Sequence, residues 1–188
     1  NSNESLLSAS VDGDNLTLAF VADESGSATI IIQGLSNSQM VTDTFLVTVN
    51  AVDDAPHVAN PIADVTVDED AADSVIALGS VFSDIDNEDG EIVKSLVSNS
   101  NESLLSASVD GDNLTLDFMD NENGSATIII EGLSDGLTVT DTFLVTVDAV
   151  DDAPHVANPI ADVTVDEDAA DSIIILTYVF SDIDNEDG

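Results

Sequence analysis

The stretch NLTLDFMDNENGSATIIIEGLSDGLTVTDTFLVTV (residues 113–147) decides the fold of this chain. Apolar and polar residues alternate along it with a period of two, so that Leu114, Leu116 and Phe118 fall on one face. That period is typical of β-strands that bury one side. An Asp-Gly pair at 135–136 is typical of a tight turn between two such strands. The stretch therefore predicts antiparallel hairpins.

The same alternation continues on the N-terminal side of this stretch and predicts seven strands in all. They lie at 62–67, 75–82, 91–97, 104–109, 113–118, 125–131 and 139–147. Seven short strands separated by turns are typical of a sandwich of two sheets. The chain has no Cys and no Trp, so its core cannot use the disulfide and tryptophan of antibody domains and must be aliphatic. The predicted core residues are Leu114, Leu116, Phe118, Ala126, Ile128, Ile130, Phe143, Val145 and Val147.

The chain repeats itself with an offset of 98 residues. The segment at 1–18 recurs at 99–116, and 75 of the 90 paired positions are identical. A period of this length suits one small domain better than a solenoid unit. If the acidic linker that ends at Pro154 is a domain boundary, its copy that ends at Pro56 is another. The predicted organisation is the C-terminal part of one repeat (1–57), a complete repeat (58–155) and the N-terminal part of the next (156–188).

Two explanations fit these incomplete ends. The chain is either a window from a longer array, or its C-terminal strands complete the N-terminal half-domain of the next chain. The second arrangement would give a head-to-tail fibre by strand exchange. It would lack one strand at each join, the copy of 91–97. The sequence leaves both explanations open.

Charge excludes several functions. The chain has 39 Asp and Glu residues against a single basic one, Lys94, which gives a formal net charge of −38. Nucleic acids and anionic membrane surfaces both require clustered Lys or Arg, so neither is an expected partner. Because 43% of the residues are hydrophobic and they are periodic, we expect a folded chain and not a disordered acidic one. Divalent cations are the obvious means of neutralising so many carboxylates.

The acidic residues are clustered, which favours a metal site. Five of them fall within 83–91, and further groups lie at 68–70 and 151–152. Ca²⁺ binds six to eight oxygen ligands with tolerant geometry. An EF-hand loop that starts at Asp84 fails on spacing, because Gly90 is at position 7 and Ser95 is at position 12. We therefore expect ligands from several loops.

Five segments carry a resemblance to a known family. VTVDAVDDAPHV (145–156) closely resembles the DxNDNxP linker that joins extracellular cadherin domains. VDED (67–70) resembles the first-strand Glu motif of that family, and FSDIDNEDGEIVKSL (82–96) resembles its DxD motif. MDNEN (119–123) and LSDG (133–136) fall where its DRE motif and next Asp-Gly turn lie. NGSATI, VTDTF and VDDAP are closer still to the tandem cadherin-like repeats of large secreted bacterial adhesins and polysaccharide-degrading systems.

The resemblance implies an all-β fold of seven-stranded Greek-key, cadherin-like or Ig-like sandwiches in tandem, with Ca²⁺ bound between neighbouring repeats. Carried over, the first junction would use Asp23, Glu24, Asn50, Asp53 and Asp54 with Asp84, Asp86 and Asp135 of the following repeat. The second would use Glu69, Asp120, Glu122, Asp148, Asp151 and Asp152 with Asp182 and Asp184.

Departures from the family pattern limit the number of ions. Val52 and Val150 replace a linker Asn, which removes a side-chain oxygen and implies one or two ions per junction. Asn50 stands where Asp148 stands in the next repeat, so the two junctions should differ in affinity.

The expected function is structural. The resemblance implies repeats of an extended extracellular or cell-surface stalk, adhesin or filament, stiffened by calcium, whose partners are neighbouring repeats and identical chains. The alternative is a calcium-dependent carbohydrate- or partner-binding module of a polysaccharide-degrading system, against which the lack of Trp and the single Tyr178 argue. We expect no enzyme activity, because every candidate group, including His57 and His155, recurs with the repeat.

Overall fold

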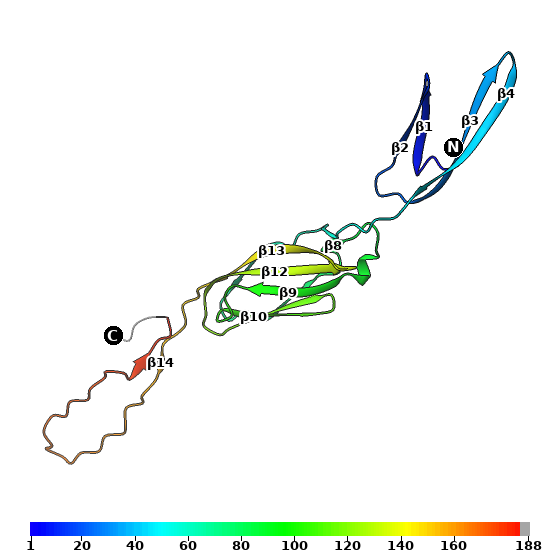
Figure 1. Cartoon of the computed structure of the whole chain (residues 1–188). Coiled ribbons are helices and arrows are strands. Elements are labelled where there is room, and N and C mark those ends of the chain that lie inside the picture. Colours follow the sequence, from blue (N-terminus) through cyan, green and yellow to red (C-terminus); the bar gives the residue numbers. More distant parts are fainter. Residues whose placement is uncertain (185–188) are drawn as a thin grey trace.

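The computed structural model describes residues 1–184, and the last four residues of the predicted third segment, 185–188, lie outside the described part. Three parts follow one another along an elongated molecule (Figure 1): two separate hairpins, a compact body and an open loop. Among residues 1–184, helical structure is limited to the short 3-10 turn Asp89–Glu91, and no segment has the length and hydrophobicity that a membrane-crossing helix requires. The secondary structure is therefore almost entirely β.

The compact body is a sandwich of two sheets. One sheet has the order β6 (Val65–Asp68), β13 (Leu137–Asp148), β12 (Gly124–Ser134), β9 (Val93–Asn99). The other has the order β10 (Leu105–Asp110), β11 (Asn113–Phe118), β7 (Ser74–Ala77). The chain crosses between the sheets after β6, β7, β9 and β11, and β6 runs parallel to β13 while the other pairs are antiparallel. This is the expected all-β, cadherin-like or Ig-like sandwich.

The core of this body is the one that the sequence predicts. All nine predicted core residues are buried, and Leu114, Leu116 and Ile128 are completely enclosed. Alternation along β11, β12 and β13 places these side chains between the two sheets. Residues from the connecting segments, among them Leu78 and Phe82, complete the same cluster.

One predicted strand is wrong in its extent. The strand expected at 75–82 ends at Ala77, and a separate short strand, β8 (Phe82–Ser83), pairs with β5 (His57–Val58). The last β7–β11 bond joins the Leu78 N–H to the Asp112 carbonyl (2.7 Å), and the chain then turns, with the Val81 N–H donating to the Leu78 carbonyl (3.1 Å). The turn brings the Phe82 ring against Gly132, where an added Cβ would lie 2.8 Å from the ring. A glycine is therefore required at position 132.

The single basic side chain joins the two sheets. Lys94 lies on the edge strand β9 but points inward, and its side chain is only 2% exposed. Its Nζ forms an ion pair with Asp112 Oδ1 (2.9 Å) in the β10–β11 turn and also donates to the Asp89 carbonyl (3.4 Å). An inward-pointing charge also discourages another strand from pairing with this edge.

The N-terminal part consists of two hairpins that do not form a closed sandwich. They are β1 (Leu7–Asp12) with β2 (Asn15–Phe20) and β3 (Gly26–Ser36) with β4 (Gln39–Val49). A small cluster that includes Leu6, Leu7 and Ile30 holds them together. Phe20 is 57% exposed, whereas Phe118, its counterpart in the complete repeat, is 7% exposed. The difference arises because the counterparts of β6, β7 and β9 do not cover these hairpins.

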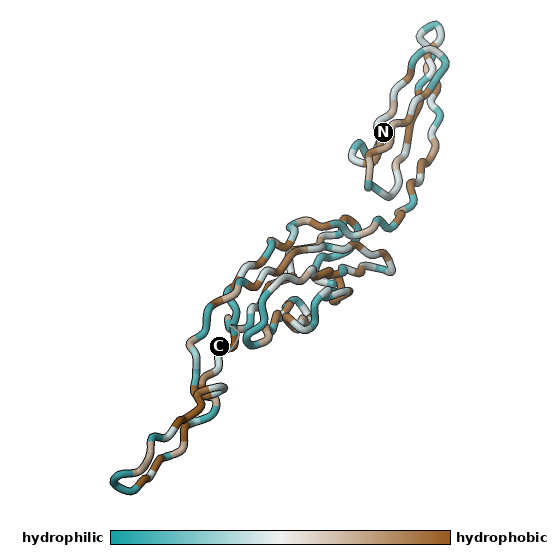
Figure 2. Tube along the Cα trace, turned by 90° about the vertical axis from the view of Figure 1, so that its left-hand side faces the viewer, coloured by the Kyte–Doolittle hydropathy of each residue, from teal (hydrophilic) through white to brown (hydrophobic). Residues whose placement is uncertain are grey.

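The C-terminal part is more open still. Within its described residues, β14 (His155–Val156) pairs with β15 (Phe180–Ser181), and no strand forms between them. The repeat offset places the copies of β6 and β7 at 163–166 and 172–175, and neither copy forms a strand. In the complete repeat those strands pair with β13 and β11, and this part of the chain offers no counterparts of either. Figure 2 shows hydrophobic segments along this loop, where residues such as Ile173 are exposed.

Matched substitutions at the repeated phenylalanine should separate the closed repeat from the open one. Phe118→Ala should destabilise the compact body by about 3–5 kcal/mol, because it removes a buried ring and leaves a cavity. Phe20→Ala should change the same transition by less than about 0.5 kcal/mol, because its ring is largely exposed. Urea unfolding of both full-length variants measures the difference, and equal losses would contradict the assignment of the core.

Candidate metal centre

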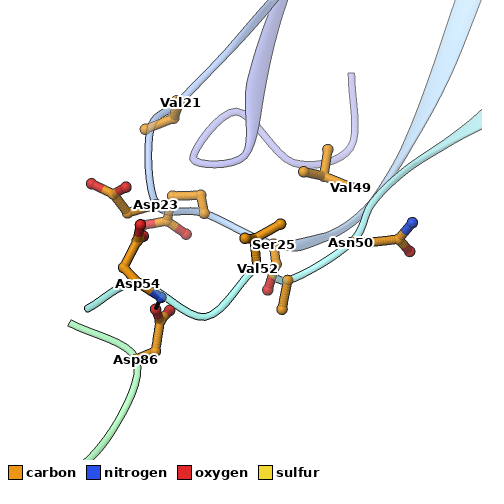
Figure 3. A pocket seen from close by; sticks show the side chains of 10 residues that line it. Val21, Asp23, Ser25, Val49, Asn50, Val52, Asp54 and Asp86 are labelled. Atoms are coloured by element: carbon orange, nitrogen blue, oxygen red, sulfur yellow. Dashed lines mark hydrogen bonds between the residues drawn. The ribbon is translucent and has the colours of Figure 1, made fainter. Parts of the chain in front are cut away.

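Most of the residues predicted for the first junction lie together where the N-terminal hairpins meet the compact body. A cavity of about 220 Å³ at this place is lined by five of the eight: Asp23, Glu24, Asn50, Asp54 and Asp86. Figure 3 shows the Asp86 carboxylate facing the backbone nitrogen of Asp54 on a neighbouring segment, while the side chain of Asn50 points away from both. Val52 also lines the cavity, at the position where the family pattern has an oxygen ligand.

Hydrogen bonds connect the linker to the loop that carries the DxD motif. The Asp54 N–H donates to Asp86 Oδ2 (2.7 Å), and the Asn87 side-chain amide donates to Asp53 Oδ1 (3.0 Å). Asp53 therefore belongs to the same group although it does not line the cavity. Sequence analysis did not select Asn87, whose only signal was its place directly after the DxD motif.

Asp84 organises this loop and retains an oxygen without a partner. Its Oδ1 accepts the N–H groups of Asp86 (2.8 Å) and Asn87 (3.1 Å), and the residue is only 8% exposed. Its Oδ2 is buried and has no hydrogen-bond partner among the described residues. Interaction with the Ser134 hydroxyl, and then with the Asp86 N–H, lowers the pKa of Asp84, although that hydroxyl does not reach hydrogen-bonding geometry with Oδ2. The buried carboxylate is therefore charged at neutral pH.

Asp135 occupies the β12–β13 turn at the same end of the sandwich. It follows Ser134 and has a positive φ of 45°, which a turn residue before glycine tolerates. Its side chain does not line the cavity formed by the described residues. The structure therefore places Asp135 near the first junction without bringing it together with the linker carboxylates.

The second junction begins at the opposite end of β13, where Glu69 reaches the linker. The Glu69 N–H donates to the Asp148 carbonyl (2.8 Å), and Glu69 Oε1 accepts the N–H of Val150. Glu69 is only 5% exposed, and its Oε2 has no hydrogen-bond partner among the described residues. The compact body thus carries one buried and unpartnered carboxylate oxygen at each end.

Several carboxylates surround Asp152 in the same linker. Burial is the first cause of its raised pKa, and the charges of Asp70, Asp184, Glu69 and Asp182 are the further causes, in that order. The Asp152 N–H donates to Asp184 Oδ2 (2.5 Å). The carboxylates that repel Asp152 come from the segment after β6 and from the segment after β15. Acidic groups from three segments therefore lie close enough to interact.

Asp70 is a member of this group that sequence analysis did not select. It has a positive φ of 61°, and its Oδ1 accepts the Asn121 N–H (2.9 Å) from the β11–β12 loop. Its signal in the sequence was its position beside Glu69. Asp120 and Glu122, which were predicted as ligands, lie exposed on that same loop.

The acidic groups do not form a finished coordination shell. Within residues 1–184, no three Asp, Glu or His side chains already converge on one point as metal ligands do. The metal ligands available at both junctions are carboxylate, amide and carbonyl oxygens. Such ligands suit Ca²⁺ rather than metals that prefer nitrogen or sulfur. The charged, buried and unpartnered Oδ2 of Asp84 fits a cation, because a buried charge without a partner is costly.

The two packed sheets and the acidic clusters at both ends of the compact body define an all-β sandwich module with acidic junctions on both sides. No family model matches the chain, and no curated protein matches it. Solved structures of similar shape include extracellular cadherin domains 3–6 of protocadherin gamma B2, which are 17% identical, with 86% of this chain and 43% of that chain covered and a TM-score of 0.46.

Other similar structures are of different kinds. The titin domains Z1Z2 in complex with telethonin are 16% identical, with 77% of this chain and 73% of that chain covered and a TM-score of 0.37. The endo-fucoidan hydrolase MfFcnA4 of glycoside hydrolase family 107 is 17% identical, with 80% of this chain covered and a TM-score of 0.37. The chain spans only 23% of that hydrolase. With TM-scores below 0.5, these likenesses are too weak to define a family, and the fold is assigned from its own sheets.

Replacing Asp84 or Asp152, the two carboxyl groups whose pKa is shifted, by asparagine should change the stability of the fold in opposite directions. The lowered pKa of Asp84 means that its charged form stabilises the fold, a contribution that is lost as pH falls through that pKa. The raised pKa of Asp152 means that its charged form destabilises the fold at neutral pH. In chelator at pH 7, Asp84→Asn should therefore lower Tm and Asp152→Asn should raise it.

Thermal unfolding from pH 7 to pH 3 tests the signs. Both differences from the wild type should shrink as acid protonates the wild-type carboxyl groups. Shifts of the same sign at pH 7, or differences that grow in acid, would contradict this account.

Proposed function

We propose that this chain is a non-catalytic structural part of an extended extracellular stalk, adhesin or filament whose repeat junctions are stiffened by Ca²⁺. The observation that carries the proposal is the charged, buried Asp84 carboxylate, whose Oδ2 has no hydrogen-bond partner among the described residues. A proton does not neutralise this group, because its pKa is lowered rather than raised. Glu69 Oε2 offers the corresponding atom at the other end of the body.

The residues that would hold an ion come from both sides of each junction. At the first junction, Asp54 and Asp86 already lie within hydrogen-bonding contact of one another. At the second, Asp152 and Asp184 do the same. A bound Ca²⁺ would supply positive charge between these pairs and so connect one repeat to the next.

The proposed mechanism is electrostatic. Without cations, carboxylates from neighbouring repeats repel each other and favour a bent or flexible linker, as the raised pKa of Asp152 indicates. With Ca²⁺, oxygen ligands from both repeats bind one ion and restrict the angle between them. Binding also stabilises the ordered state, by about 2.7 kcal/mol per site at a hundredfold excess over Kd.

An extracellular location suits this mechanism. Extracellular calcium modules typically have Kd values of about 10⁻⁴ to 10⁻³ M, which match external calcium and not the cytosol. The repetition of every acidic cluster in each period also suits a scaffold better than a unique active site. We therefore propose no catalytic residue.

End-to-end joining of chains by strand exchange is a finer form of the proposal. The hairpins β1–β4 leave Phe20 exposed, and the copies of β6 and β7 at the other end of the chain are unpaired. The complete repeat shows that such segments pair with each other when both are present. A second chain could therefore supply the missing strands, except for the copy of β9.

Calcium titration of the full chain tests the junctions. Small-angle X-ray scattering in about 2 mM Ca²⁺ should show longer, stiffer particles than in excess chelator, because extracellular modules are largely occupied at that concentration. Asp84→Asn should weaken binding at the first junction and Glu69→Gln at the second, each by about tenfold or more in Kd. Calorimetry then resolves the affected sites.

Asp12→Asn is the matched control, because it removes an exposed carboxylate from the β1–β2 turn, which the whole length of β2 separates from the first junction. It should leave calcium binding unchanged. If scattering curves with calcium and with chelator superimpose, the stiffening mechanism is wrong. Calcium-dependent retention on insoluble polysaccharide would instead favour the carbohydrate-binding alternative.

A further inference from the structure

The outer face of the β12–β13 hairpin has very few charges. Residues at alternate positions point away from the core, from Ser125 to Leu133 on β12 and from Thr138 to Thr146 on β13. These outward positions all lie within residues 1–184, and Glu131 is the one charged residue among them. In the whole chain, by contrast, 21% of the residues are charged. Threonine, serine and large aliphatic side chains fill the remaining positions.

The counterpart of this face on the first repeat carries no charge. Outward positions run from Ser27 to Leu35 on β3 and from Met40 to Thr48 on β4, and Gln33 replaces Glu131. Large apolar side chains among them are exposed, with Leu46 at 66%. We call the outward positions of β3–β4 and β12–β13, apart from Glu131, the uncharged face.

In the complete repeat the uncharged face continues onto the neighbouring strand β9. Val93 and Val97 are exposed there, beside the outward residues of β12. Figure 1 shows β9, β12 and β13 side by side on one surface of the body. Three strands therefore share this surface.

Carboxylates surround the uncharged face, and Glu131 is the one that lies among its residues. Asp64 lies at its β6 side, where its Oδ1 accepts the Leu144 N–H (2.8 Å). The outer face of the opposite sheet carries Asp110 and Asp117 on β10 and β11. Two copies of a chain with a net charge of −38 repel each other at all such surfaces. A face with a single carboxylate allows closer approach of like chains than these surfaces do.

We propose that the uncharged face is a lateral contact surface between two copies of this chain. The available area suits such a contact. At about 3.4 Å per residue and about 4.8 Å between strands, β12, β13 and β9 offer roughly 400 Å², and the separate hairpin β3–β4 offers roughly 300 Å² more. Standard stable interfaces bury about 800 Å² per partner, so the face approaches the required size.

This contact goes beyond the proposed calcium junctions and does not depend on them. None of the junction carboxylates lies on the uncharged face. Strand exchange would cover the inward side chains of β1–β4, which lie on the opposite face of those hairpins. Lateral pairing doubles the mass per unit length of the particle. Strand exchange instead lengthens the particle at constant cross-section.

Salt should strengthen the contact, which is the reverse of what an interface made of ion pairs would show. Repulsion between two polyanions is screened as the Debye length falls from about 10 Å at 0.1 M to about 3 Å at 1 M ionic strength. Contact between aliphatic and hydroxyl side chains is not weakened by that screening. Pairing should therefore be tighter in 0.5 M than in 0.05 M NaCl.

The test uses the full chain in small-angle X-ray scattering and sedimentation velocity over a range of protein concentrations, with 2 mM Ca²⁺ and in chelator. We expect the mass and the mass per unit length to double together as concentration and NaCl rise. The double variant Leu46→Asp/Leu144→Asp, which places a carboxylate on each hairpin, should weaken pairing at least tenfold. Circular dichroism checks that it remains folded.

Val75→Asp is the control, because Val75 is 64% exposed on the outer face of the opposite sheet. It should pair as the wild type does. A wild type that stays monomeric, particles that only lengthen, pairing that survives the double variant, or pairing that Val75→Asp also abolishes would each overturn the proposal. Retention of the monomer on neutral polysaccharide, lost in the double variant, would assign the face to a different partner and overturn it too.

Discussion

Repulsion between carboxylates is the constraint on which the rest of this structure depends. With one lysine for 39 acidic residues, ion pairing cannot balance the charge, and Lys94 forms its ion pair with Asp112 between the sheets. Most of the remaining acidic residues occupy turns, strand ends and linkers, although Glu131 and Asp141 lie inside strands. Most inward strand positions are therefore free to bury aliphatic side chains. The charge is thereby concentrated at the two ends of the sandwich, where Asp84 and Glu69 are enclosed.

Closure of the sandwich depends on strands that are far apart in the chain. β6 pairs with β13 and β7 with β11, so a repeat encloses its core only when its first and last strands are both present. The hairpins β1–β4 are nearly identical in sequence to β10–β13, yet they expose Phe20 because their covering strands are absent. Local sequence therefore decides the hairpins, and long-range pairing decides the core.

Sequence alone predicts the hairpins and the core because both follow from alternation and turn residues. It misplaces the end of β7, where a turn closed by the Val81 N–H and the Leu78 carbonyl interrupts an apolar run that reads as one strand. It also overlooks Asp70 and Asn87, whose roles depend on which loops meet in space. The predicted ligands on the linkers and the DxD loop largely gather at the junctions, whereas Asp135, Asp120 and Glu122 depend on loop geometry that spacing does not encode.

The parallel pairing of β6 with β13 has a mechanical consequence. The chain enters the compact body beside β6 and leaves it after β13, at opposite ends. Tension applied along the molecule therefore pulls these two strands past each other, and it loads the hydrogen bonds between Val65–Asp68 and Val145–Asp148 in shear. Bonds loaded in this way break together and not one at a time. A sandwich connected in this manner resists stretching far better than a hairpin that is pulled open from its ends.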